Sequence, residues 1–198
     1  MATITTRKGQ IVQDPPLVHW LLNDKRAGWI WFLLRIWLGW QWVTAASHKI
    51  TNPAWMVTGE ALKGFWVKSL SGTIAFGWYR TFLQAMVDAQ AYTWFAKVVA
   101  TGELLVGIGL ILGAFTGIAA FFGGLMNWNF MMAGSASTNP MLFVIAVGLI
   151  LAWKVSGYIG VDYVLLPRLG TPWGTKEEET QKESGQFSIP SPKPAPGD

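Results

Sequence analysis

Three polar side chains interrupt segments of this chain that are otherwise almost entirely apolar. Arg35 lies within the run WIWFLLRIWLGWQWVTAA, and Glu103 and Asn127 interrupt two later apolar runs. A charge at the centre of a membrane helix costs about 2.5–3.5 kcal/mol on insertion scales, so it needs a compensating partner. A guanidinium and a carboxylate at the same depth neutralise each other, best in bidentate geometry. We therefore predict that Arg35 pairs with Glu103 and that Asn127 points into the same interior.

Four more polar residues are expected in the outer half of the same helices, close to several tryptophans: His48, Lys49, Lys97 and Asn129. Aromatic walls with cationic or amide donors at each end suit a flat, amphipathic ligand that carries two carbonyl groups. A quinone has this chemistry, and it is the cofactor that we predict. In this interpretation Arg35 and Glu103 are the catalytic pair that holds or protonates the quinone ring. The binding donors are Lys97, Asn127, Asn129, His48 and Lys49.

Each of these residues also has a structural interpretation, which the sequence leaves open. The Arg35–Glu103 pair would also serve as a staple that fixes helix register. Lys97 would also fit as a cation that reaches the membrane interface along its apolar stem. The two asparagines would also fit as hydrogen-bonding groups between packed helices.

Other cofactors are not expected, because the chain contains no cysteine and only two histidines. The lack of cysteine excludes disulfides, iron–sulfur clusters, thiolate zinc sites and covalently attached haem. His19 lies outside the apolar runs, so it does not form with His48 the pair of ligands that a bis-histidine haem needs. We therefore predict no haem, iron–sulfur or metal site, and no redox centre within the chain itself.

The composition favours a membrane protein. Of 198 residues, 52% are hydrophobic, 13% are charged and 13 are tryptophan, whereas soluble domains carry about 25% charged residues. Tryptophan is enriched where lipid meets water. The net charge of +4 comes from scattered basic residues, so a nucleic-acid partner is not expected and the lipid bilayer is.

Four apolar runs approach the roughly 20 residues that cross a bilayer as a helix. The first three cover residues 27–46, 92–112 and 116–133, and the fourth starts at Met141, passes Trp153 and can continue beyond Lys154. Within the loop between the first two runs, residues 52–70 and 78–92 mix aromatic residues with single charges, a pattern typical of helices on a membrane surface. The predicted fold is an all-α integral membrane protein, a four-transmembrane-helix bundle with short amphipathic helices in this outer loop.

Charge placement predicts the orientation and the domain limits. Lys25, Arg26, Lys154 and Arg168 flank one side of the spans, so the positive-inside rule places both termini in the cytoplasm of an inner, multi-pass membrane protein. We expect a cytoplasmic arm (1–26), a membrane domain (27–167) and a tail (168–198). The tail is rich in proline, serine and charge, so on its own it is expected to be disordered and to need a partner subunit to hold it.

At these residues the chain resembles the DoxX/DoxD family of small four-helix membrane proteins. The first run has an Arg, a Gly four residues later and a Lys at its end (Arg35, Gly39 and Lys49), although Ala45, Ala46 and Ser47 stand where the family commonly has a Gly. The second run matches the pattern Glu-x3-Gly-x2-Leu-x2-Gly at Glu103, Gly107, Leu110 and Gly113. The segment NWNFMMAGSASTNP (127–140) is similar to the DoxD branch. The resemblance implies a membrane subunit linked to quinone-coupled oxidation, with thiosulfate:quinone oxidoreductase as the activity named for that branch.

Two functions from different classes follow from these residues and motifs. The first is a quinone-interacting membrane subunit of an oxidoreductase, which binds the quinone while a partner supplies electrons. The alternative is a non-catalytic accessory subunit of a larger respiratory or photosynthetic membrane complex. Both use the same polar residues, so the sequence does not separate them.

Overall fold

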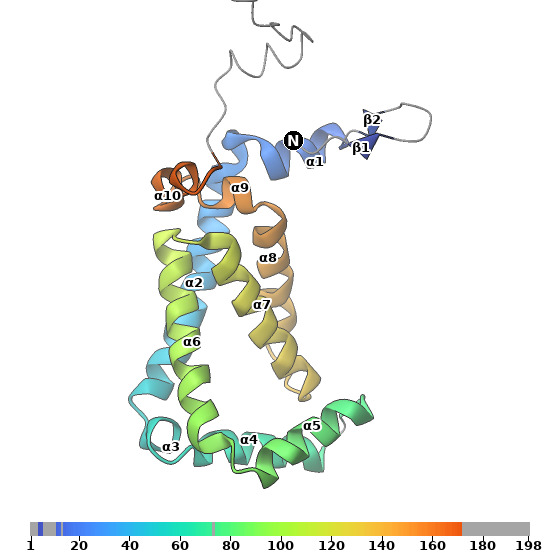
Figure 1. Cartoon of the computed structure of the whole chain (residues 1–198), viewed down its shortest axis with the longest axis vertical. Helices are drawn as coiled ribbons and strands as arrows, with labels where there is room; N and C mark the ends of the chain where they lie inside the picture. The colour runs from blue at the N-terminus through green and yellow to red at the C-terminus, as the bar shows by residue number, and fades with distance from the viewer. Residues whose placement is uncertain (1–3, 6–10, 13, 73, 172–198) are drawn as a thin grey trace, which may run out of the picture. The chain divides into compact units, whose positions relative to one another are not determined.

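The computed structural model describes residues 4–5, 11–12, 14–72 and 74–171, and helices make up most of them (Figure 1). This confirms the all-α prediction. A short antiparallel strand pair, in which Ile4 faces Val12, precedes the helices. In chain order the elements are β1 (Ile4–Thr5), β2 (Ile11–Val12), α1 (Pro16–Asn23), the 3-10 turn η1 (Lys25–Ala27), α2 (Gly28–Ile50), α3 (Pro53–Met56), α4 (Glu60–Ser71), α5 (Gly77–Asp88), α6 (Tyr92–Leu112), α7 (Thr116–Met132), α8 (Asn139–Leu151), α9 (Trp153–Ser156) and α10 (Asp162–Arg168).

The chain divides into two compact units, residues 1–163 and 164–198. The first unit holds the helices from α1 to α9 and the first residues of α10. The predicted tail falls in the second unit, and its residues 172–198 lie outside the part of the chain that the structure describes. The prediction that a partner holds this tail therefore stays a prediction.

Four long helices, α2, α6, α7 and α8, run antiparallel in sequence order within the first unit (Figure 1). Their bounds lie within a few residues of the four apolar runs. A core of apolar side chains joins them: Ala27, Trp31, Leu38, Trp42, Val106, Leu110, Ala120, Leu142, Ala146, Leu149, Ala152 and Val155. Helix α1 was not predicted, because it lies in the N-terminal arm, outside the four apolar runs. It is tied to α2 by a hydrogen bond of 2.7 Å from Trp31 Nε1 to the carbonyl oxygen of Leu21.

Helices α2 and α6 make the closest approach in the bundle, at two glycines. A Cβ on Gly107 would lie 2.8 Å from Val43 N and 3.0 Å from Gly39 O, and a Cβ on Gly39 would lie 3.0 Å from Gly107 O. These distances are shorter than side chains tolerate, so only glycine permits this separation. Small residues that let backbones approach are typical of packed membrane helices. The contact fixes the register of the two antiparallel helices. Val43 is level with Gly107, and Gly39, one turn earlier, lies against the turn from Gly107 to Ile111.

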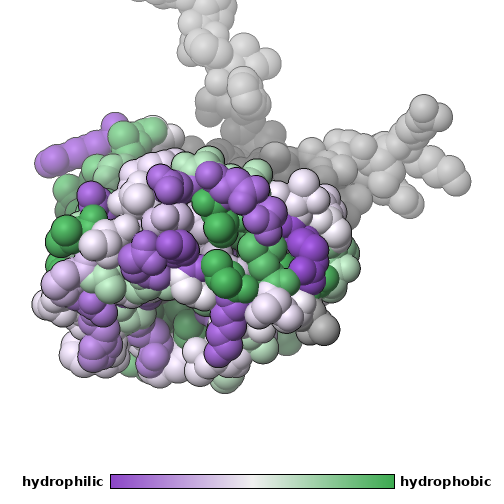
Figure 2. All heavy atoms as spheres, turned by 90° about the horizontal axis from the view of Figure 1, so that it is seen from below, coloured by the Kyte–Doolittle hydropathy of each residue, from purple (hydrophilic) through white to green (hydrophobic). Residues whose placement is uncertain are grey.

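The helices of the outer loop form a cap at one end of the bundle. Asn52 begins α3 by accepting a hydrogen bond of 2.9 Å from Ala54 N, which is typical of a helix N-cap. Helices α4 and α5 then bury a second apolar cluster against the start of α6: Leu62, Trp66, Ile74, Tyr79, Leu83, Tyr92, Ala96 and Ala133. Figure 2 looks onto this end, where hydrophilic and hydrophobic residues are interspersed. The helices predicted over 52–70 and 78–92 therefore form, the first segment as two helices, α3 and α4, and the second as α5.

Large apolar side chains also cover the outside of the bundle. On α2, Trp29, Leu33, Trp37 and Trp40 form a stripe in which each residue is at least 42% exposed. The other long helices carry further exposed apolar residues: Trp94, Val98, Leu105, Ile108, Leu112, Ile118, Phe121, Phe122, Leu125, Met141, Val144 and Leu151. Within the described residues, α6 is the one helix long and apolar enough to cross a membrane by these two criteria alone, and α8 is apolar but has 13 residues.

The α2–α6 contact gives a first testable prediction. Replacing Gly107 by alanine improves helix propensity by up to about 1 kcal/mol, but its Cβ meets the backbone of Val43. We expect Gly107→Ala to lower the free energy of unfolding by about 1–3 kcal/mol, as overpacking does. Gly64→Ala in α4 is the matched control, because a Cβ there meets nothing within 4 Å. Thermal unfolding of the purified variants measures both, and an equally stable Gly107→Ala variant would contradict the assigned register.

Candidate functional site

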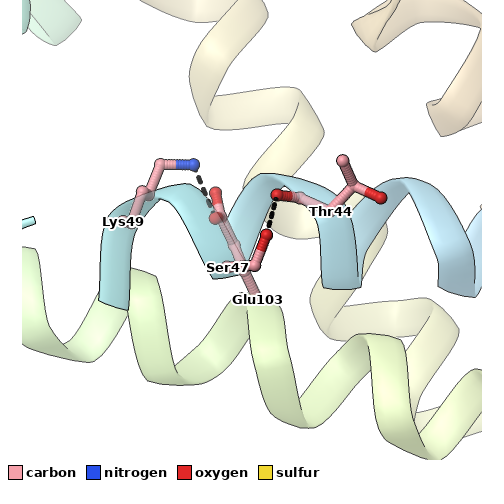
Figure 3. A network of polar contacts seen from close by, with 4 residues as sticks. All are labelled: Thr44, Ser47, Lys49 and Glu103. Carbon is pink, nitrogen blue, oxygen red and sulfur yellow. Dashed lines mark hydrogen bonds and ion pairs between the residues drawn. The ribbon is translucent and has the colours of Figure 1, made fainter. Parts of the chain in front are cut away.

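The buried carboxylate of Glu103 pairs with Lys49, and not with Arg35 as predicted. Lys49 Nζ donates a hydrogen bond of 2.6 Å to Glu103 Oε2 across the α2–α6 contact (Figure 3). The side chain of Glu103 is 1% exposed and that of Lys49 is 18% exposed. The ammonium of Lys49 also lies 5.2 Å from the ring centre of Trp55, close enough for a cation–π contact.

The predicted Arg35–Glu103 pair is wrong because the two helices are staggered. With Val43 level with Gly107, Glu103 is level with Ser47, and Arg35 lies three turns away. Twelve residues of helix correspond to a rise of about 18 Å. Counting residues from the ends of the apolar runs placed both groups at mid-depth, because it treated α2 and α6 as if they began and ended together.

Arg35 lies instead at the other end of the bundle, where α6 ends. Its Nη2 donates a hydrogen bond of 2.6 Å to the carbonyl oxygen of Ile159, and the guanidinium lies 5.5 Å from the ring centre of Phe32. The chain makes room for it at Gly113, which has φ of +66° and whose missing side chain would occupy the position of the guanidinium. Backbone and ring contacts thus compensate part of the cost of burying this charge.

Asp162 is a second buried charge in the same region, and no sequence pattern predicted it. Its two carboxylate oxygens accept hydrogen bonds of 2.7 and 2.8 Å from the backbone N–H groups of Phe115 and Thr116, where α7 begins. A carboxylate is favourable at a helix N-terminus because it satisfies free N–H groups and opposes the helix dipole. Its charge also attracts the Arg35 guanidinium. We interpret this inner cluster as structural.

The Lys49–Glu103 pair lines a cavity of about 330 Å³ at the end of the bundle that α3, α4 and α5 cap. The lining residues come from α2, α3, α4, α6, α7, α8 and the loop before α8: Gln41, Trp42, Ala45, Lys49, Trp55, Phe65, Glu103, Asn127, Phe130, Ser135, Ser137, Thr138, Asn139 and Leu142. Of the predicted site residues, Lys49, Glu103 and Asn127 therefore meet in one place. Such a volume is within the range of small-molecule sites.

Two residues that line this cavity, Asn127 and Trp42, have buried side-chain polar atoms with no partner among the described residues, and Trp42 contributes only its Nε1. The side chain of Asn127 is 0% exposed, and neither its Nδ2 nor its Oδ1 has a hydrogen-bond partner among the described residues. Buried polar atoms almost always have partners, and leaving one unpaired costs about 1–3 kcal/mol. An amide that supplies donors and an acceptor, beside an ion pair that supplies mobile protons, is equipped to bind a polar ring and protonate it.

The remaining predicted residues are not in this cavity. His48 and Lys97 are exposed, Lys97 on the same face of α6 as Thr101 and Trp94. Asn129 lines a neighbouring cavity, where its Oδ1 accepts a hydrogen bond of 3.2 Å from the hydroxyl of Tyr79. Burial raises the pKa of Tyr79 to about 12, so this hydroxyl stays protonated and available as a donor at neutral pH.

Several residues of the cavity were not predicted as site residues, and for one of them, Gln41, the sequence contained an indication. Gln41 lies on the same face of α2 as Lys49, since the two are eight residues apart, and it is the one uncharged polar residue in WLGWQWV. Trp55 comes from the four-residue helix α3, and Ser135, Ser137 and Thr138 come from the loop before α8, so no helical periodicity predicts the direction of these side chains. No group of three or more His, Cys, Asp or Glu residues that would suit a metal ion occurs within the described ranges.

The ion pair gives a second prediction. Replacing Lys49 by methionine leaves the Glu103 carboxylate buried without its partner, which for buried pairs costs about 3–5 kcal/mol. We expect the double variant Lys49→Met/Glu103→Leu to be more stable than Lys49→Met alone, in a denaturant titration of the free energy of unfolding. Lys63→Met is the control, because it breaks the exposed Lys63–Glu60 pair and should leave stability nearly unchanged. Additive effects of the two substitutions would contradict the pairing.

The inner cluster gives a third prediction. In Asp162→Asn one oxygen is replaced by an NH₂ group that faces a backbone N–H, so α7 loses one of its two caps. We expect a loss of about 1–3 kcal/mol in the free energy of unfolding. Asp88→Asn is the control, because Asp88 is exposed and accepts from Gln84. Equal stability of the two variants would show that the Asp162 cap contributes nothing.

Comparison with known proteins adds no constraint to this site. No protein-family model, curated protein or solved structure matches the chain. The resemblance to the DoxX/DoxD family therefore stays a prediction from the motifs at Arg35, Gly39, Lys49, Glu103 and Gly107. The site is defined by its own geometry, an ion pair and an unsatisfied amide in one cavity.

Proposed function

We propose that the first unit is a four-helix bundle embedded in the membrane. The support is the distribution of its side chains, which is the reverse of that in a soluble protein. Arg35, Glu103, Asn127 and Asp162 are each at most 1% exposed, while stripes of tryptophan, leucine, valine and phenylalanine cover the outside of α2, α6, α7 and α8. Continuous apolar surface of this kind marks contact with lipid or with another protein. Lipid contact explains why it surrounds the bundle.

The proposed orientation keeps both termini in the cytoplasm, at the inner membrane of the cell. Lys25, Arg26 and Lys154 lie at the start of α2 and beyond the end of α8. A Cβ on Gly28 would lie 3.6 Å from Val155 O, so these basic residues gather at one end of the bundle, as the positive-inside rule requires of the cytoplasmic end. The cap of α3, α4 and α5 then lies at the outer surface.

For this bundle we propose the function of a quinone-interacting subunit of an oxidoreductase, of the DoxX/DoxD type. The carrying observation is the fully buried Asn127 amide, which has no protein partner among the described residues, in the cavity of the Lys49–Glu103 pair. Its Nδ2 would donate to one ring carbonyl and Lys49 Nζ to the other. Reduction to the quinol takes up two electrons, which a partner subunit with a redox centre would supply, and two protons. The ion pair holds one transferable proton at a time, on Lys49 Nζ, so it would deliver the two protons in succession, and a proton from water would restore the ammonium after each transfer.

In this proposal Arg35 no longer belongs to the reacting groups. It contacts Ile159 at the end of the bundle opposite to the cavity, and its role is the structural staple that the sequence left open. Glu103 holds the Lys49 ammonium, through which the protons would pass, and Lys49 and Asn127 keep the binding role.

Substituting Asn127 tests the proposal and separates a ligand site from a structural hydrogen bond. Asn127→Leu removes an unsatisfied amide, so the thermal unfolding temperature should stay equal or rise. The affinity of the Asn127→Leu variant for decylubiquinone should fall at least tenfold, which corresponds to a loss of about 1.4 kcal/mol in binding free energy. The measurement is saturable quenching of tryptophan fluorescence by decylubiquinone, with the full chain in lipid nanodiscs, since Trp42 and Trp55 line the cavity.

Gln84→Leu is the matched control, because it removes an exposed amide that contacts only Asp88 in the described hydrogen bonds. It should bind the quinone as the unchanged protein does. A destabilised Asn127→Leu variant with unchanged affinity would make the amide interhelical glue. If the unchanged protein shows no saturable quinone binding, the quinone function is wrong and an accessory structural role takes its place.

A further inference from the structure

A second cavity lies beside the polar one, and its lining is almost entirely apolar. Its volume is about 340 Å³, and it lies between α4, α5, α6 and α7. The residues are Leu62, Phe65, Trp66, Tyr79, Phe82, Leu83, Phe95, Val98, Val99, Gly102, Leu105, Val106, Phe122, Leu125, Met126, Asn129 and Phe130. None of these carries a charge, and the Tyr79 hydroxyl and the Asn129 side chain bond to each other. The cavity therefore offers volume without a site for a polar head group.

The apolar cavity borders the outer surface of the bundle that faces lipid in the proposed function. Five of its lining residues are at least 42% exposed: Phe82, Val98, Leu105, Phe122 and Leu125. They come from the outward faces of α5, α6 and α7. A hydrocarbon chain can therefore reach the cavity from the side, through the bilayer, without crossing water.

The two cavities share a boundary. Phe65 of α4 and Phe130 of α7 line both, and their rings meet edge to face with centres 6.1 Å apart. On α6, neighbouring residues face different cavities, since Gly102 lines the apolar one and Glu103 the polar one. A single molecule with a polar ring and an apolar tail would thus place its two parts on either side of this phenylalanine pair.

We propose that the apolar cavity binds the hydrocarbon tail of the same quinone whose ring occupies the polar cavity. This inference rests on the proposed function and adds to it a specificity for long-tailed quinones. A phospholipid is a poorer occupant, because no charged side chain lines the cavity to hold its head group. The tail leaves the ring past Phe65 and Phe130 and extends between α6 and α7 to the lipid.

Filling the apolar cavity tests this inference. Gly102 lines this cavity, and a Cβ on it would meet only Met126 Sδ, at the ordinary contact distance of 3.8 Å, so a side chain can be introduced there. We expect Gly102→Phe to weaken the binding of decylubiquinone at least tenfold. The affinity for the tail-free parent dimethoxybenzoquinone should change less than twofold. Fluorescence quenching in nanodiscs measures both, with Gly64→Phe as the control because Gly64 faces open space.

Each outcome decides a separate point. If Gly102→Phe weakens neither quinone, or both equally, the tail site is wrong while the ring site stands. If the unchanged protein binds the two quinones with equal affinity, the tail contributes nothing and the inference is overturned. If Asn127→Leu also fails to weaken either quinone, the proposed function fails as well. Should Gly102→Phe lower the unfolding temperature, Val99→Phe and Leu83→Phe fill the same cavity from α6 and α5 and must give the same preference.

Discussion

The close contact between α2 and α6 determines where the buried charges of these two helices lie. Gly39 and Gly107 allow the two backbones to meet, and a Cβ at either position would overlap the other helix. This register brings Lys49 level with Glu103 and carries Arg35 beyond the end of α6. A shift of one helical turn would leave the carboxylate without a cation, at the cost of an unpaired buried charge. The packing of two glycines thus sets the positions of these charges.

The two ends of the bundle satisfy their polar groups differently. At the inner end, Asp162 accepts two backbone N–H groups and Arg35 donates to a carbonyl oxygen, so charges complete the backbone hydrogen bonding at a helix turn. At the outer end, the charges pair with each other, and the Asn127 amide has no partner within the described residues. Buried polar atoms without a partner among the described residues occur at both ends, since Arg35 Nε and Nη1 and Thr116 Oγ1 also have none. Asn127 differs from them because both polar atoms of its side chain are unpaired and because it lines a cavity together with an ion pair. Buried polar groups are normally satisfied, so this cavity is where a ligand is expected.

The helices were predictable because apolar runs broken by glycine and asparagine–proline define them directly in the sequence. The short glycine-containing segment GAFTG, residues 113–117, separates α6 from α7 and leaves only three residues between the two helices. The site was predictable only in part. Asn127 and Glu103 were recognised because a polar residue in an apolar run is conspicuous. The cation that pairs with Glu103 was not predictable, because counting residues from the helix ends ignores the stagger that Gly39 and Gly107 impose on α2 and α6.

Lys97 and Asp162 also show that a sequence pattern within one helix does not predict which polar side chains are buried. Lys97 lies on α6 six residues before Glu103, but its side chain is exposed, because the face of α6 that carries Glu103 is the buried one. Asp162 lies beyond the last apolar run, where an acidic residue is ordinary, yet it is 1% exposed because its loop returns to the start of α7. Single-helix periodicity predicts neither outcome, because both depend on contacts between segments far apart in the chain.

The asymmetry of the ion pair indicates how protons would reach the proposed ring. Glu103 is 1% exposed and Lys49 is 18% exposed, so water contacts the lysine and scarcely reaches the carboxylate. A proton lost from the pair to a reduced ring would therefore be replaced through Lys49, at the outer end of α2. The carboxylate would keep its charge buried and hold the ammonium in place between turnovers. In this arrangement protons enter from the outer surface beside Trp55, while the tail cavity opens sideways between α6 and α7. Protons from water and a lipid-soluble ligand would thus reach the ring from different sides of the bundle, the protons past Lys49 and the ligand through the apolar cavity.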